Sequence, residues 1–195
     1  QLSEADLLSM TVMQWDCEVK LEGLQNPLVI TTSPIYNLPS FELTPLIQVQ
    51  SLHLYVAQLG AGGSVHPFNT VKDYEDWLKR LDDYIAFLDT SIANMKEGIA
   101  KGIVLPKVLT EKTIVQLDEF ITKPVEEHLF YRPIQSMPEG ISQSDRDRLE
   151  QEYQNVIETK LRPKYTELKQ FLVAEYLPVC RTTSGIGALP NGSAT

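Results

Sequence analysis

The sequence is poor in the residues that most often build catalytic and metal-binding sites. It has two cysteines and three histidines among 195 residues. Cys17 and Cys180 are too few, and too far apart in the sequence, to form a disulfide framework. Neither belongs to a C-x-x-C motif, which excludes a redox-active pair of neighbouring thiols. A single disulfide between Cys17 and Cys180 is compatible with the sequence, because it requires only that the two ends of the chain lie close together.

The three histidines do not have the spacing of a zinc site. Zinc hydrolases commonly place two histidine ligands one helical turn apart with a glutamate between them, in the pattern H-E-x-x-H. His53, His66 and His128 cannot form it. His128 follows Glu126 and Glu127, but adjacent residues of a helix do not face one another. We therefore predict hydrogen-bonded structural roles for the histidines and no metal site at His128.

Other motifs of catalysis and cofactor binding are missing as well. The nucleophile elbow G-x-S-x-G and the dinucleotide fingerprint G-x-G-x-x-G do not occur. The glycine-rich stretch 60–64 lacks the phosphate-binding pattern and is interpreted as a connector between helices. Neighbouring carboxylates, at 82–83 and at 126–127, are interpreted as surface charge. We therefore predict no catalytic, cofactor-binding or metal-binding residue in this chain.

A basic surface and a membrane-spanning segment are also missing. The chain has 17 lysine and arginine residues against 26 aspartate and glutamate residues, for a net charge of −9. Nucleic acids and anionic membranes bind basic faces, so we expect neither as a partner. No apolar run approaches the roughly 18–20 residues that cross a bilayer. No signal-peptide pattern occurs, and the start at Gln1 leads us to expect a processed or trimmed protein.

The sequence does contain a strong helical pattern over about residues 70–102. Thr70 is placed to cap its start, Asp73 to meet the free amides there, and Gly102 to end it in the left-handed conformation. We expect a helix of about 31 residues, with an axial rise of about 1.5 Å per residue. Its apolar residues recur at alternating steps of three and four, which places them on one face: Val71, Tyr74, Leu78, Leu81, Ile85, Leu88, Ile92, Met95 and Ile99.

Further helices are predicted at 3–21, 44–59, 106–121 and 142–176. The first has a broad apolar face, which predicts burial on two sides, and Pro163 should kink or divide the last. In the proline-rich stretch between the first two helices, residues 28–32 have the pattern of a short strand but no clear partner strand, so the stretch is interpreted as an extended loop. The expected fold is mainly α: a bundle of about five to seven helices around the long one. We expect a single domain over 1–195 with an irregular tail at 181–195.

Three segments of the chain resemble one bacterial family. They read PFNTVKDYEDWLKRL at 67–81, IANMKEGIAKGIVLPK at 92–107, and LRPKY, YLP and GALPNG within 161–192. In this order they resemble the N-terminal part of the domain-of-unknown-function family 885 (DUF885). Its members are considerably longer, mainly helical, and similar to zinc metallopeptidases of the gluzincin type. Many carry secretion or lipoprotein signals, which implies a periplasmic, secreted or cell-envelope location.

The resemblance implies an activity that this chain does not contain. In that family the H-E motif and its further zinc ligands follow the segment that matches 187–190, and they have no counterpart here. The chain alone is therefore expected not to be an enzyme, whereas a longer parent would be a zinc-dependent peptidase acting on peptides. Zinc is expected only in the downstream part of that parent, which would also be the partner of this chain.

Two functions are compatible with the sequence. The first is a non-catalytic N-terminal scaffold, or cleft wall, of a metallopeptidase-like protein; the alternative is a self-contained helical binding module of the bacterial cell envelope. The sequence beyond Thr195 would distinguish them. Two apolar stretches, 130–134 and the face with Phe171, Leu172 and Tyr176, are expected to be exposed and to favour a homodimer; the alternative is that both fold onto the long helix.

Overall fold

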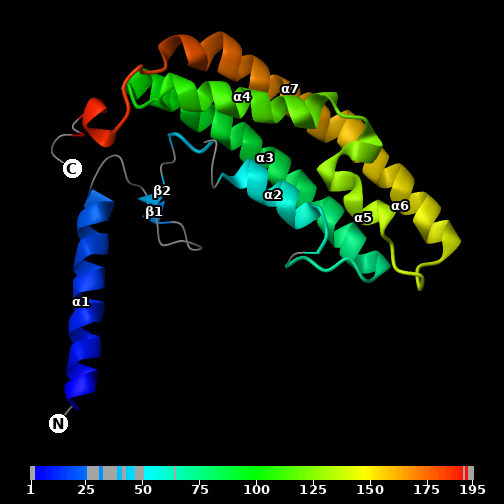
Figure 1. Ribbon diagram of the computed structural model, residues 1–195, viewed down its shortest axis with the longest axis horizontal. Coiled ribbons are helices and arrows are strands. Elements are labelled where there is room, and N and C mark those ends of the chain that lie inside the picture. The colour runs from blue at the N-terminus through cyan, green and yellow to red at the C-terminus, as the bar shows by residue number, and fades with distance from the viewer. Residues whose placement is uncertain are drawn as a thin grey trace. The chain divides into compact units, whose positions relative to one another are not determined.

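The computed structural model describes residues 3–25, 31–32, 39–40, 43–46, 51–63, 65–190 and 192 (Figure 1). The chain divides into two compact units, one formed by residues 43–184 and the other by residues 1–42 together with 185–195. The described residues are predominantly helical, which confirms the predicted mainly α fold. The prediction of a single domain over 1–195 stays a prediction.

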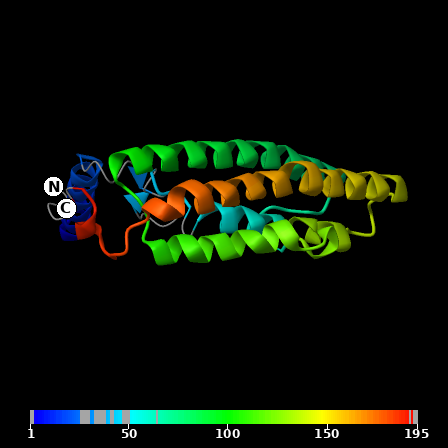
Figure 2. The same ribbon diagram turned by 90° about the horizontal axis from the view of Figure 1, so that it is seen from above.

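The larger unit is a helical bundle. In it α3 and the helix formed by α6 and α7 run in the same direction, and α4 runs antiparallel to α7 beside them (Figures 1 and 2). Short 3-10 turns lie at Val125–Glu127, Leu129–Tyr131 and Leu177–Val179. The α-helices are α2 (Leu52–Gly60), α3 (Val71–Lys101), α4 (Lys107–Thr122), α5 (Arg132–Gln135), α6 (Gln143–Val156) and α7 (Arg162–Phe171).

The smaller unit contains one long helix and one short pair of strands. Helix α1 covers Glu4–Gln25, which confirms the predicted helix over 3–21 and extends it. Strand β1 (Thr31–Thr32) pairs antiparallel with β2 (Pro39–Ser40), so the interpretation of this stretch as an unpaired loop is wrong at Thr31–Thr32. Residues 28–30 lie outside the described residues. A 3-10 turn at Ile186–Ala188 belongs to the predicted tail.

Both ends of α3 follow the prediction. The Thr70 side chain accepts a hydrogen bond from the Asp73 amide, while the Asp73 carboxylate accepts one from the Thr70 amide at 2.8 Å. This capping box satisfies two of the amides that the first turn leaves free. At the other end Gly102 adopts a φ of 70°, and Ile103 N–H donates to Gly98 O at 2.8 Å. Local sequence therefore sets the length of α3.

The start of α2 differs from the prediction, and of the two outcomes predicted at Pro163, a kink or a division, the division does not occur. Helix α2 begins at Leu52 after an extended Ser51 and not at Thr44. The backbone of the last helix continues from α6 into α7 through a π-helical turn at Ile157–Leu161, and beyond α7 through a second one at Leu172–Tyr176. A proline has no N–H and its ring crowds the carbonyl four residues back. The wider π-helical turn accommodates it.

The core lies between α3, α4 and the last helix. The side chains of Leu81, Leu88, Leu117, Leu161 and Leu168 are fully buried there. Helix α3 turns the predicted face inward, with Leu78 and Ile85 at the edge of the core. This part of the prediction is confirmed.

The two apolar stretches predicted to be exposed are buried, so that prediction is wrong. The 3-10 turn at Leu129–Tyr131 places Phe130 with its ring centroid 6.4 Å from those of Trp77, Tyr84 and Phe120. Phe130 is fully buried, as is Tyr176 on the last helix, and Phe171 and Leu172 are nearly so. The larger unit therefore closes its own core at both places. Most of the exposed large apolar side chains among the described residues lie on α1.

Ion pairs join α3 to the last helix at every seventh residue of α3. Glu75 pairs with Arg148 at 2.8 Å, Asp82 with Lys160 at 2.6 Å, and Asp89 with Lys164 at 2.5 Å. Lys96 and Glu175 continue the series at 3.4 Å. Apart from Lys164, whose side chain is 16% exposed, the members of these pairs are largely exposed, and exposed pairs contribute only about 0–1 kcal/mol each. Together they link α3 to the last helix along most of the length of α3.

A hydrogen bond between two buried tyrosines links α3 to α7. The hydroxyls of Tyr84 and Tyr165 lie 2.9 Å apart, and both side chains are buried. Replacing Tyr165→Phe would leave the Tyr84 hydroxyl without this partner, and a buried polar group without a partner costs about 1–3 kcal/mol. We expect urea unfolding to show a loss of that size. The double variant with Tyr84→Phe should recover part of it, and a double variant less stable than Tyr165→Phe would contradict this assignment.

Candidate functional site

The histidines were the residues most able to form a catalytic or metal centre, and the structure places all three inside the larger unit. His53 lies on α2, His66 precedes α3, and His128 caps the 3-10 turn at Leu129–Tyr131. All three side chains are buried. They lie at separate places in the fold, each with its own set of partners.

His53 is held by two side chains. Its Nε2 lies 3.3 Å from Gln116 Oε1, and its Nδ1 lies 2.7 Å from Ser51 Oγ. An amide oxygen only accepts, so Nε2 carries the proton and Nδ1 is the acceptor that faces the Ser51 hydroxyl, whose proton is shared with the Pro45 carbonyl 3.3 Å away. A serine that donates to histidine is also the arrangement of an activated nucleophile. Here Ser51 is 2% exposed and His53 0%, so the pair offers no hydroxyl surface to a substrate.

Burial also sets the protonation of His53. It lowers the pKa of the imidazole from 6.5 to about 4, and the hydrogen bond to Gln116 opposes that shift in part. The imidazole is therefore neutral at neutral pH. A neutral ring with both nitrogens bonded to the protein is a structural group.

His66 has the same pattern of donor and acceptor. Its Nε2 donates to the Asp73 carbonyl at 3.0 Å, and its Nδ1 accepts from Arg80 Nη1 at 3.2 Å. The ring packs against Phe68 and Trp77, with centroid distances of 4.7 Å and 5.0 Å. His66 therefore anchors the loop before α3 to the first turns of that helix.

His128 repeats the pattern with backbone partners. Its Nε2 donates to the Phe120 carbonyl at 3.2 Å, and its Nδ1 accepts from the Phe130 amide at 3.4 Å. Burial lowers the pKa of its imidazole to about 4. His128 thus ties the end of α4 to the turn that carries Phe130. The predicted structural roles of the histidines are confirmed, since both ring nitrogens of each one are bonded within the fold.

The other candidates for chemistry are also accounted for. The side chains at 82–83 and 126–127 are exposed, as predicted for surface charge. Cys17 on α1 and Cys180 after the last helix are free thiols. Cys180 Sγ lies 3.2 Å from Thr110 Oγ1, and burial raises the pKa of its thiol. Across the described ranges, no three histidine, cysteine, aspartate or glutamate side chains are grouped as ligands for a metal ion.

Helix α1 carries the candidate interaction surface of the chain. Two rows of apolar side chains, which we call the Trp15 seam and the Met10 seam, follow the helix. The sequence predicted burial of this helix on two sides, but these side chains are exposed. Trp15, for example, is 63% exposed. The Trp15 seam consists of Leu8, Val12, Trp15 and Val19, and the Met10 seam of Leu7, Met10, Met13, Cys17 and Leu21.

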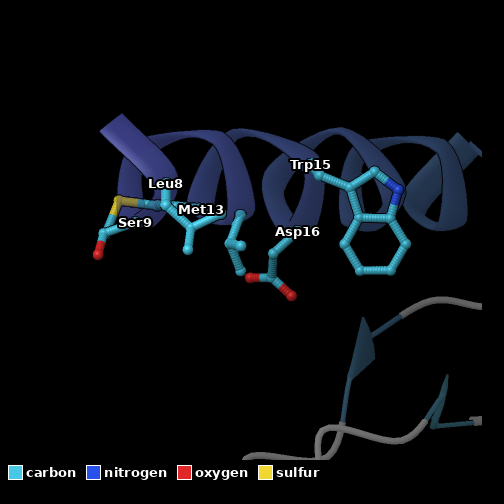
Figure 3. A pocket seen from close by; sticks show the side chains of 6 residues that line it. Leu8, Ser9, Met13, Trp15 and Asp16 are labelled. Carbon is cyan, nitrogen blue, oxygen red and sulfur yellow. The ribbon is translucent and has the colours of Figure 1, made fainter. Parts of the chain in front are cut away.

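A shallow hollow lies along one side of α1. The Trp15 seam provides Leu8, Val12 and Trp15 to its lining, and Figure 3 shows these side chains with Ser9, Met13 and Asp16. Asp16 is paired with Lys20 at 2.7 Å. The lining is thus mainly apolar, with an ion pair beside it. Such a surface suits contact with an apolar side chain of another helix.

Comparison with known proteins places the chain in a family. The sequence matches the family described as "Bacterial protein of unknown function (DUF885)" over residues 1–195. The chain belongs to this family. A search of curated proteins found no match. None of the described helices is both long and apolar enough to span a membrane.

A solved structure with a similar fold is larger than this chain. The structure described as "the putative lipoprotein from Colwellia psychrerythraea" superimposes with a TM-score of 0.70 at 19% sequence identity. The match covers 79% of the present chain and 26% of the other. The chain therefore spans about a quarter of the length of that protein, and at this identity the likeness shows the fold alone.

Proposed function

We propose that this chain is a non-catalytic helical scaffold that forms one wall of a cleft in a longer DUF885 protein. The observation that carries the proposal is the use of all three histidines as structural groups, each with both ring nitrogens bonded inside the fold. Nitrogens engaged in this way are not free to bind a metal ion. A zinc centre of the gluzincin type would then lie in polypeptide outside this sequence.

The length of the solved relative supports the same proposal. Its chain is matched only over 26% of its length, so a protein with this fold can hold a large additional part. In our proposal that part supplies the zinc ligands, a peptide is the substrate, and the helices described above shape the cleft. The description of the relative as a lipoprotein supports a location in the cell envelope.

A second candidate function rests on α1. Its exposed apolar seams would also suit a self-contained binding module of the bacterial cell envelope. The two functions differ in the partner of α1, which is the rest of the same protein in the first and a separate protein in the second. The first has the support of the solved relative, whereas the second has no observation that identifies a separate partner.

The zinc content of the chain tests the proposal. We expect the purified 195-residue chain, incubated with zinc and then dialysed, to retain no stoichiometric metal by elemental analysis. It should also cleave no member of a peptide library, because the ring nitrogens of its histidines are bonded within the fold. One tightly held zinc ion per chain, or hydrolysis that a chelator abolishes, would contradict a non-catalytic role.

A further inference from the structure

The two seams of α1 lie on nearly opposite sides of the helix. Successive residues are about 100° apart around an α-helix of 3.6 residues per turn. Leu8, Val12, Trp15 and Val19 fall on one side by this spacing, and the Met10 seam falls on the other. Two strips of polar residues separate the seams. Thr11 and Glu18 lie in one strip, and Ser9 and Asp16 lie in the other. A helix of this kind is suited to lie between two neighbours.

The charge of α1 argues against a second copy as the partner. The helix has five acidic residues, namely Glu4, Asp6, Asp16, Glu18 and Glu22, against the single base Lys20, so its side chains carry −4. Two copies side by side would bring equal negative charges together. A two-fold contact would also use the same seam on both copies, which leaves the opposite seam exposed. A partner with basic residues beside its apolar positions fits better.

We propose that α1 docks between two helices of a longer DUF885 chain, with both seams buried and basic residues facing the acidic strip that contains Glu4, Glu18 and Glu22. The proposal rests on the proposed function, because it takes the partner helices from polypeptide outside this sequence. The length of the solved relative, about four times the matched part, leaves room for them. Docking of α1 would bind the scaffold to the rest of the protein through contacts on both sides of this helix.

Oxidative footprinting measures both seams in one experiment. Trp15 reports on one seam and Met10 on the other, and peptide mapping by mass spectrometry resolves each residue in a chain of any length. Trp77, which is 2% exposed, is the internal control for folding. Hydroxyl radicals should oxidise Trp15 and Met10 rapidly in the 195-residue chain and at least about tenfold more slowly in the longer protein, as side-chain burial blocks access. Trp77 should be protected in both.

Neighbouring substitutions test whether the seam or the helix as a whole is in contact. Leu8→Asp places a charge in the Trp15 seam, and Thr11→Asp places the same charge in the polar strip that does not line the hollow. In the longer protein we expect Leu8→Asp to lower the midpoint of thermal unfolding by several degrees and Thr11→Asp to leave it unchanged. In the 195-residue chain neither should matter, because Leu8 is exposed there.

Three results would overturn the proposal. Equal oxidation of Trp15 and Met10 in both proteins would show that α1 is not docked. Protection of one seam alone would show a single neighbour. Protection that appears in the 195-residue chain as its own concentration rises would identify a second copy as the partner. None of these results depends on zinc, so failure here is separate from failure of the proposed function.

Discussion

Acidification from pH 7 to pH 5 is expected to lower the free energy of unfolding by about 4 kcal/mol through two histidines. The pKa values of His53 and His128 are lowered to about 4 in the folded chain, against 6.5 as the ordinary value. Between these values the unfolded chain binds protons that the folded chain does not, so stability falls as the pH falls. Above about pH 6.5 the free energy of unfolding changes little with pH. By pH 5 the titration of each histidine has lowered it by about 2 kcal/mol.

Urea unfolding at pH 7, 6 and 5 measures this effect. The interval from pH 7 to pH 5 lies above the range in which the capping carboxylates titrate, because hydrogen bonds lower the pKa values of Asp73 and Asp145. The variant His53→Gln should keep a polar group and lose its share of the pH dependence, so that the slope falls by about half. An unfolding free energy that is constant from pH 7 to pH 5 would contradict the burial of neutral imidazoles.

Truncation of Leu81 is expected to cost about 2–5 kcal/mol of stability. Its side chain is 0% exposed in the centre of the inward face of α3. Leu81→Ala removes buried apolar surface and leaves a cavity, and the two terms add. This cost is a large part of the 5–15 kcal/mol by which native domains are stable.

Two matched variants on the same helix serve as controls for Leu81. Lys79 and Asp83 are exposed on the opposite face of α3. Lys79→Ala and Asp83→Ala should each change the free energy of unfolding by less than about 0.5 kcal/mol, as is usual for surface sites. Equal effects of Leu81→Ala and Lys79→Ala in urea unfolding would mean that the inward face of α3 is misassigned.

Local signals made much of this fold predictable. The capping box at Thr70, the left-handed Gly102 and the period of the apolar residues together determine α3, and all act within a few residues of one another. The structural roles of the histidines could also be predicted, because their spacing excludes a shared zinc site. Their individual partners could not. The contact of His53 with Gln116, for example, joins residues 63 positions apart.

The errors arose where distant packing overrides a local pattern. The apolar stretch around Phe130 was expected to need an outside partner, yet α3 and α4 supply Trp77, Tyr84 and Phe120 to cover it. Helix α1 shows the opposite error. Its broad apolar face predicts burial, but its seams are exposed in this chain. The periodicity of apolar residues shows that a helix face needs a partner. It does not show which polypeptide provides that partner.

Zinc content and peptidase activity of the longer protein, measured after single replacements of the three histidines, test the central claim most directly. The variants are His53→Gln, His66→Gln and His128→Gln, each purified as folded protein and assayed for zinc per folded molecule. We expect each variant to unfold at a lower temperature than the parent while its zinc content and its rate per folded molecule stay unchanged. A folded variant that loses its zinc would show that this chain supplies a metal ligand, and would contradict the assignment of the chain as a non-catalytic scaffold.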